Sequence, residues 1–187
     1  MQRRPFLLGL ALAGAGGTPL AAEPDPAEQA LRQGGCALLL RHARTDPGVG
    51  DPPGFRLGVC STQRNLSEAG RADARAVGRW FAAARMRPQA VRSSAWCRCI
   101  DTAQLAFGAS VPWPPLDSTF DSPSLSASAT QALRGALAGI APGRFEVWVT
   151  HQVNITALTG EGPAMGEGLV VGAQARVLAR WQARRGG

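Results

Sequence analysis

Short apolar runs alternate along the chain with longer stretches in which apolar residues recur every three or four positions. Residues 36–40 and 145–150 are nearly continuous apolar runs, which is typical of parallel strands buried on both faces of a sheet. Residues 90–93 predict a further short strand, and residues 168–171 and 175–181 predict a closing strand pair. The core is therefore expected to form around one sheet of these strands.

Three helices are expected between the strands. Ser67 is a good N-cap, and apolar residues recur at helical spacing from there to Ala84. A second helix is expected at about residues 95–107, ending at Gly108, and a third at about residues 128–140. The order strand, helix, strand, helix, helix, strand predicts an α/β fold, a three-layer sandwich whose mostly parallel central sheet is flanked by helices.

Residues 45–65 are expected to form a long loop. The segment is rich in Pro and Gly, and Asp46-Pro47-Gly48 and Asp51-Pro52-Pro53-Gly54 are turn signals. Loops of this length in a compact domain tend to carry function.

The first 22 residues have the pattern of an export signal. Arg3 and Arg4 precede an apolar run at residues 6–15 and a small-residue end at Ala21-Ala22, and the run is too short to span a bilayer stably. The general secretory and twin-arginine routes both remain open, and the alternative is a frayed amino terminus of a cytosolic protein. We expect residues 1–22 to be an export signal, 23–34 a linker and 35–187 a single domain. The mature protein would then be periplasmic or secreted, with no stable membrane span.

Composition and charge exclude several classes of protein. The chain has 187 residues, of which 45% are hydrophobic, so it is neither a disordered tail nor a collagen. All 20 basic residues are Arg, against 13 acidic residues, a net charge of +7. Removing Arg3 and Arg4 with the leader leaves 18 basic against 13 acidic, or +5. The arginines are dispersed among acidic residues, which predicts no nucleic-acid partner.

Four cysteines remain after the leader, and export would place them where disulfides form. Cys36 starts an apolar run and is expected to be a buried small residue. The best interpretation of the others is a disulfide from Cys60 to either Cys97 or Cys99. No second Cys or His pair lies at a matching spacing, so no metal site is predicted.

The chain has two histidines, and each directly follows an apolar strand run. His42 follows residues 36–41 and His151 follows residues 145–150. Ligands of open α/β sheets bind beyond the carboxyl ends of the strands. Both imidazoles are therefore expected at the same rim of the sheet.

Three segments resemble those of the histidine phosphatase superfamily, which includes the phosphoglycerate mutases. They are Leu40-Arg41-His42-Ala43-Arg44-Thr45, Ser93-Ser94-Ala95-Trp96-Cys97-Arg98-Cys99-Ile100-Asp101-Thr102-Ala103 and Val149-Thr150-His151. The resemblance extends from about residue 35 to residue 181, and it implies the phosphoglycerate mutase-like fold.

The resemblance also implies an activity and the residues that perform it. His42 would be the nucleophile that accepts a phosphoryl group, and Arg41, Arg98 and His151 would line the phosphate pocket. Guanidinium groups suit this role, because charge spreads over the equatorial oxygens of a phosphoryl group in transfer. The mechanism needs neither a metal nor an organic cofactor.

Two positions depart from the family pattern. Ala43 replaces the usual Gly of the first segment. Gln152 stands where one branch of the family has its general acid, and an amide cannot supply a titrating proton. The remaining candidates are Asp121, our first choice, and Asp117, although each could equally be a turn or helix-cap residue.

Other polar residues near these segments are candidates for binding. Arg44 and Thr45 directly follow the nucleophile and could touch the phosphate. Possible substrate contacts are Gln63, Arg64, Asn65, Gln152 and Asn154. An N-cap role is as good an interpretation of Asn154.

The sequence thus predicts an exported phosphomonoesterase of the histidine acid phosphatase type, acting through a phosphohistidine on His42. Its small phosphorylated substrate could be a sugar phosphate, a phosphate of an envelope glycolipid or a nucleotide. The alternatives are a non-catalytic phosphate-binding protein on the same fold and a phosphomutase. A mutase must retain its phosphoenzyme, which is harder to reconcile with export.

Overall fold

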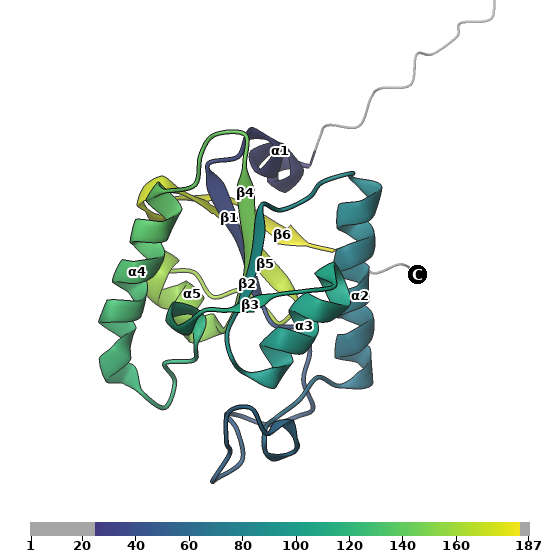
Figure 1. Ribbon diagram of the computed structural model, residues 1–187, viewed down its shortest axis with the longest axis vertical. Coiled ribbons are helices and arrows are strands. Elements are labelled where there is room, and N and C mark those ends of the chain that lie inside the picture. The colour runs from purple at the N-terminus through teal and green to yellow at the C-terminus, as the bar shows by residue number, and fades with distance from the viewer. Residues whose placement is uncertain (1–24, 184–187) are drawn as a thin grey trace, which may run out of the picture.

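The computed structural model describes residues 25–183, which form a six-stranded sheet between two layers of helices (Figure 1). The expected leader, residues 1–22, lies outside the described residues. The strands are β1 Cys36–Arg41, β2 Ala90–Ser93, β3 Val111–Pro112, β4 Phe145–Thr150, β5 Glu167–Gly172 and β6 Val177–Gln182. The helices are α1 Pro26–Gln33, α2 Glu68–Ala83, α3 Cys97–Phe107, α4 Ser126–Ala138 and α5 Gln152–Thr159.

The sheet has the strand order β3-β2-β4-β1-β5-β6 and is mixed. Strands β3, β2, β4 and β1 run parallel to one another, whereas β5 is antiparallel to both β1 and β6. Figure 1 shows α2 and α3 on one side of the sheet and α4 and α5 on the other. The predicted α/β fold with flanking helices is confirmed.

Strand β1 is apolar throughout because both of its faces are covered. Leu38 and Leu40 pack into the core beneath α1, α2 and α3. Leu39, which points the other way, packs with α4 and α5. A strand in this position has no solvent-facing side, which explains the unbroken hydrophobic run.

Two helices were not predicted. The segment interpreted as a linker, residues 23–34, contains α1, whose Ala27, Ala30 and Leu31 are buried in the core. Asp25 caps this helix by accepting a hydrogen bond from the Ala27 N–H. The linker prediction is therefore wrong for these residues, because three apolar positions on one face are enough to dock a short capped helix. Helix α5 begins directly after His151.

The loop at residues 45–65 hangs below the carboxyl ends of the strands in Figure 1 and is tied to α3 by a disulfide. The bond joins Cys60 to Cys97, the first residue of α3. Cys99, the other partner left open by the sequence, is a buried free thiol, as is Cys36. No helix among residues 25–183 is long and apolar enough to cross a membrane.

The disulfide gives a stability prediction. Its cysteines are 37 residues apart, and closing a loop of that length is worth roughly 4 kcal/mol through the entropy of the unfolded chain. Reduction is expected to lower the melting temperature, measured by circular dichroism with and without a phosphine reductant. The Cys60→Ala, Cys97→Ala double variant should melt near the reduced protein and be insensitive to reductant. An unchanged melting temperature after proven reduction would contradict the prediction.

Candidate active site

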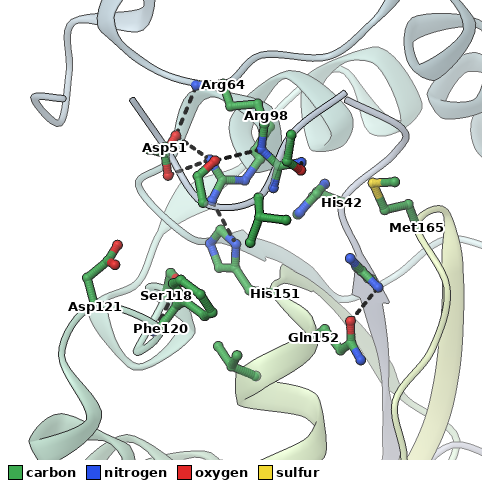
Figure 2. Close-up of a pocket in the computed structure, with 15 residues that line it drawn as sticks. His42, Asp51, Arg64, Arg98, Ser118, Phe120, Asp121, His151, Gln152 and Met165 are labelled. Atoms are coloured by element: carbon green, nitrogen blue, oxygen red, sulfur yellow. Dashed lines mark hydrogen bonds and ion pairs between the residues drawn. The ribbon is translucent and has the colours of Figure 1, made fainter. Parts of the chain in front are cut away.

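A pocket of about 320 Å³ opens beyond the carboxyl ends of β1 and β4 (Figure 2). Both histidines line it, because His42 follows β1 and His151 follows β4, and these two strands are paired in parallel register. Their ring centroids are 5.5 Å apart. The expectation that both imidazoles share one rim of the sheet is therefore confirmed.

His42 is held in one orientation by its own backbone. The side chain is 3% exposed, and Nδ1 lies 2.9 Å from the carbonyl oxygen of Ala43. A carbonyl can only accept, so Nδ1 carries the proton and Nε2 keeps its lone pair. Arg44, two residues after His42, packs closely against α2. A Cβ on Gly70 of α2 would lie 1.8 Å from the Arg44 carbonyl oxygen, so the backbone can approach this closely only at a glycine.

His42 is neutral in the folded protein. Its pKa is lowered to about 3, chiefly by burial and also by the nearby guanidinium groups of Arg98, Arg41 and Arg64, which together outweigh the Ala43 hydrogen bond. The imidazolium form is disfavoured because a buried charge loses its hydration and meets like charges. The Nε2 lone pair is consequently available at neutral pH.

His151 is also buried, with 4% of its surface exposed. Its Nε2 lies 2.8 Å from Ser94 Oγ, and its Nδ1 lies 3.4 Å from Nη2 of Arg98. Burial lowers the pKa of His151 well below its usual value, and His42 and Arg98 lower the pKa further. Both imidazoles of the pocket are thus neutral before an anion binds.

These two buried histidines predict acid sensitivity. The unfolded chain takes up a proton on His42 near pH 6.5, whereas the folded chain does so only near pH 3. The unfolded state therefore binds more protons between these pH values, and the free energy of unfolding should fall as the pH drops, by about 1.4 kcal/mol per pH unit for His42 alone. His151 adds to the loss in the same direction.

Urea unfolding at several pH values between 7 and 4 measures this slope. The His42→Asn variant removes one titrating group and should give a shallower profile than the wild type. A stability that stays level from pH 6.5 to pH 4 would contradict the prediction.

Arg98 forms a buried ion pair that the sequence did not reveal. Its Nη1 lies 2.8 and 3.0 Å from the two carboxylate oxygens of Asp51, and the side chains are 4% and 3% exposed. Asp51 also accepts hydrogen bonds from Trp96 Nε1 and from the backbone N–H of Arg64. Burial by itself raises the pKa of Asp51, but the Arg98 and N–H donors outweigh it, and the net pKa is below the usual value. In the sequence, Asp51 was only part of a turn signal.

Two further guanidinium groups line the pocket, and each is held by polar neighbours. Nη1 of Arg41 donates to Gln152 Oε1 at 2.7 Å. Nη1 of Arg64 donates to Thr45 Oγ1 at 2.7 Å, and its Nε donates to the Gly50 carbonyl at 2.8 Å. Gln152 and Thr45 therefore position arginines, and Gln152 itself lines the pocket.

The pocket carries an excess of positive charge. Its lining includes three arginines, Arg41, Arg64 and Arg98, but two carboxylates, Asp51 and Asp121. The Nε atoms of Arg41 and Arg98 are buried and have no hydrogen-bond partner among the described residues. Buried donors without an acceptor are costly. An anion is the occupant that this charge and these donors favour.

The two candidate acids lie in different places. Asp121 lines the pocket with Ser118 and Phe120, and its side chain is exposed (Figure 2). Asp117 does not line the pocket. Its Oδ1 accepts a hydrogen bond from the Ala95 N–H at 2.7 Å, just before α3. Asp117 is therefore not placed to act as the general acid that the sequence led us to expect.

Five other candidates do not line the pocket either. One is Thr45, whose hydroxyl accepts a hydrogen bond from Arg64. The guanidinium of Arg44 pairs with Asp73, and Gln63 accepts the N–H of Cys97. The Asn65 amide donates to the carbonyls of Cys60 and Gln63, and that of Asn154 donates to the Asp117 carbonyl. These side chains bind backbone groups, hold Arg64 or form a salt bridge. They do not make the contacts to phosphate or substrate that the sequence led us to expect.

The comparisons with known proteins agree with this geometry. Residues 37–117, the segment that carries His42 and Arg98, match the family model of the histidine phosphatase superfamily (branch 1). The match includes the first two of the three segments by which the chain resembles this superfamily. No protein with a curated description matches the sequence.

Several solved structures share the fold of this chain. SixA from Agrobacterium tumefaciens is 24% identical, with 78% of this chain and 97% of that chain covered and a TM-score of 0.54. A mycobacterial glucosyl-3-phosphoglycerate phosphatase solved with VO3 is 18% identical, with 81% and 100% covered and a TM-score of 0.57. TTHB049 from Thermus thermophilus is 19% identical, with 79% and 99% covered and a TM-score of 0.54. At these identities the likeness establishes the fold.

Proposed function

We propose that this protein is a phosphomonoesterase that works through a phosphohistidine on His42. The observation that carries the proposal is the state of His42, which is neutral and hydrogen bonded through Nδ1, with Nε2 unprotonated in a pocket lined by three guanidinium groups. The match of residues 37–117 to the histidine phosphatase superfamily supports it. One of the structural neighbours is named as a phosphatase of a sugar-containing phosphate ester.

The reaction would proceed in two displacements. The Nε2 lone pair of His42 forms a bond to phosphorus while the bond from phosphorus to the leaving oxygen breaks, and that oxygen takes a proton. Water then attacks the phosphohistidine, the P–N bond breaks and inorganic phosphate leaves. Arg41, Arg64 and Arg98 would bind the phosphoryl oxygens, whose charge they are positioned to stabilise.

Asp121 is the remaining candidate for the general acid, since it is the carboxylate at the pocket wall that no described guanidinium holds. Asp121→Asn is expected to lower kcat for an alkyl phosphate by about 10²-fold and to leave para-nitrophenyl phosphate nearly unaffected, because an activated leaving group needs little protonation. Steady-state kinetics on the two esters measures the difference. The matched control is Asp46→Asn, an exposed loop residue outside the pocket. Equal effects on both esters would contradict the acid role.

The substrate class is best found by a screen. A cavity of about 320 Å³ has room for a phosphoryl group and part of its leaving group. Sugar phosphates, glycolipid phosphates and nucleotides should be tested with free phosphate as the readout. Acid-quench trapping of a phosphoryl group on His42, detected by peptide mass spectrometry, tests the mechanism. Absence of label during proven turnover would refute it, and binding without turnover would favour the non-catalytic alternative.

We further propose that the protein is exported. The pattern of residues 1–22 motivates this, and the disulfide between Cys60 and Cys97 supports it, because disulfides persist in oxidising compartments. Fractionation of the native host, with the mass of the mature protein, tests it. Recovery of the uncleaved chain in the cytosol would refute it.

A further inference from the structure

A chain of polar contacts leads from His151 away from the pocket to a carboxylate. His151 Nε2 lies 2.8 Å from Ser94 Oγ. Burial raises the pKa of Asp117, and the interaction of its carboxylate with the Ser94 hydroxyl opposes that rise. Asp117 is fixed in turn by the Ala95 N–H at 2.7 Å. Ser94 is fully buried and Asp117 half-buried, so this relay is sheltered from solvent.

The donors and acceptors along the relay can be assigned from chemistry. A guanidinium only donates, so the Arg98 Nη2 contact at 3.4 Å requires a lone pair on His151 Nδ1. The ring proton then lies on Nε2 and is donated to Ser94 Oγ. The Ser94 hydroxyl, having accepted this bond, has its own hydrogen left to donate to Asp117. The ionised form of that carboxylate can only accept, and the Ser94 hydroxyl and the Ala95 N–H favour it against the rise in pKa that burial causes.

This arrangement leaves His151 in the wrong state to receive an anion. Its Nδ1 lone pair faces Arg98 on the pocket side (Figure 2). An anion that takes over the Arg98 donor would place its oxygens against that lone pair, and two acceptors repel. Adding a proton to Nδ1 turns the repulsion into a charge-assisted hydrogen bond.

We propose that anion binding in this pocket is coupled to proton uptake by His151, and that Ser94 and Asp117 are positioning residues that stabilise the resulting imidazolium. The proposal rests on the proposed function, because it concerns the same pocket. In it, Asp117 acts on His151 through Ser94 and does not serve as the general acid. His42 is unsuited to take this proton, because its nucleophilic Nε2 must stay free.

The charged and titratable groups around His151 are consistent with this assignment. Arg41, Arg64 and Arg98 and the neighbouring His42 disfavour the imidazolium in the empty pocket. Cys99 Sγ lies 3.5 Å from Nε2, and burial raises the pKa of this thiol to about 12, so it stays protonated. Asp51 neutralises part of Arg98. Asp117 is the carboxylate that the relay connects to the ring, and an incoming dianion adds the negative charge that makes protonation favourable.

Sulfate is the best probe, because it remains a dianion across the working pH range and any proton taken up must come to the protein. Titration calorimetry of the full chain at pH 6.5 to 8, in buffers of different ionisation enthalpy, measures protons taken up per sulfate. Close to one proton is expected at the lower pH values. The uptake should persist in His42→Asn and be lost in His151→Gln.

Two variants test the relay itself. Asp117→Asn keeps an oxygen for the Ala95 N–H but loses the charge, and Ser94→Ala breaks the chain. In each, the pH midpoint of proton uptake should shift down by about one unit, since a hydrogen bond to an ionised group changes a protonation equilibrium roughly tenfold. Ser93→Ala is the matched control, because Ser93 is equally buried but its hydroxyl partners Ser110.

The outcomes separate this inference from the proposed function. Sulfate binding without proton uptake at any pH would overturn the coupling while leaving the phosphatase proposal intact. Uptake that Asp117→Asn and Ser94→Ala do not shift would overturn the role of the relay. A protein that binds neither sulfate nor phosphate would refute the anion pocket itself.

Discussion

Replacing His42 with alanine is expected to lower phosphate release from para-nitrophenyl phosphate by at least about 10⁴-fold, because the covalent route is lost with its nucleophile. The three guanidinium groups remain in the variant, so the pocket should still bind sulfate or phosphate. Stopped assays with free phosphate as the readout, together with calorimetric anion binding, separate loss of chemistry from loss of binding.

The control for this variant is its fold. His42→Ala should melt at or above the wild-type temperature near pH 5, because the buried neutral imidazole, which costs stability in acid, has been removed. A variant that folds, binds phosphate and keeps wild-type turnover would refute His42 as the nucleophile.

Replacing Arg98 with methionine is expected to have the largest effect on stability. The substitution leaves Asp51 buried without its ionic partner, and breaking a buried pair on one side costs about 3–5 kcal/mol. It also removes a cation from the pocket, so the affinity for phosphate should fall by at least about 10-fold. Chemical denaturation and calorimetric phosphate binding measure the two losses.

A double variant separates these two roles of Arg98. In Arg98→Met, Asp51→Asn the unpaired charge is gone, so most of the lost stability should return, whereas phosphate binding should not. Trp96 Nε1 and the Arg64 N–H still find an amide oxygen at position 51. If the double variant were as unstable as Arg98→Met, the buried ion pair would not be the cause.

The strands and the longer helices were predictable because their signals are local. β1 and β4 are apolar runs, and α2 has a cap at Ser67 and helical spacing. α1 was missed although Asp25 and Pro26 are good start signals, since the helix is short and its apolar face consists of two alanines and one leucine. α5 was missed because it has only eight residues and its apolar and polar positions are not separated onto two faces, with Asn154 buried beside Ile155 and Leu158.

The candidate site divides in the same way. His42, His151, Arg41 and Arg98 could be identified because they adjoin strand ends or lie within segments that resemble a known family. Arg44, Gln63, Asn65 and Asn154 lie equally near these segments, yet their side chains turn to salt bridges and backbone groups away from the pocket. Closeness in sequence to a site residue does not specify the direction in which a side chain points.

The sequence alone was enough for the α/β architecture, the strand ends that carry both histidines and the chemical type of the site, because hydrophobic periodicity and adjacent residues encode them. It did not identify Asp51 as the partner of Arg98, Thr45 and Gly50 as the residues that hold Arg64, or Ser94 and Asp117 as the support of His151. Asp51 and Arg98 are 47 positions apart and His151 and Ser94 are 57 apart. Such contacts arise when strands, loop and α3 pack together, and no local pattern records which distant residues that packing will join.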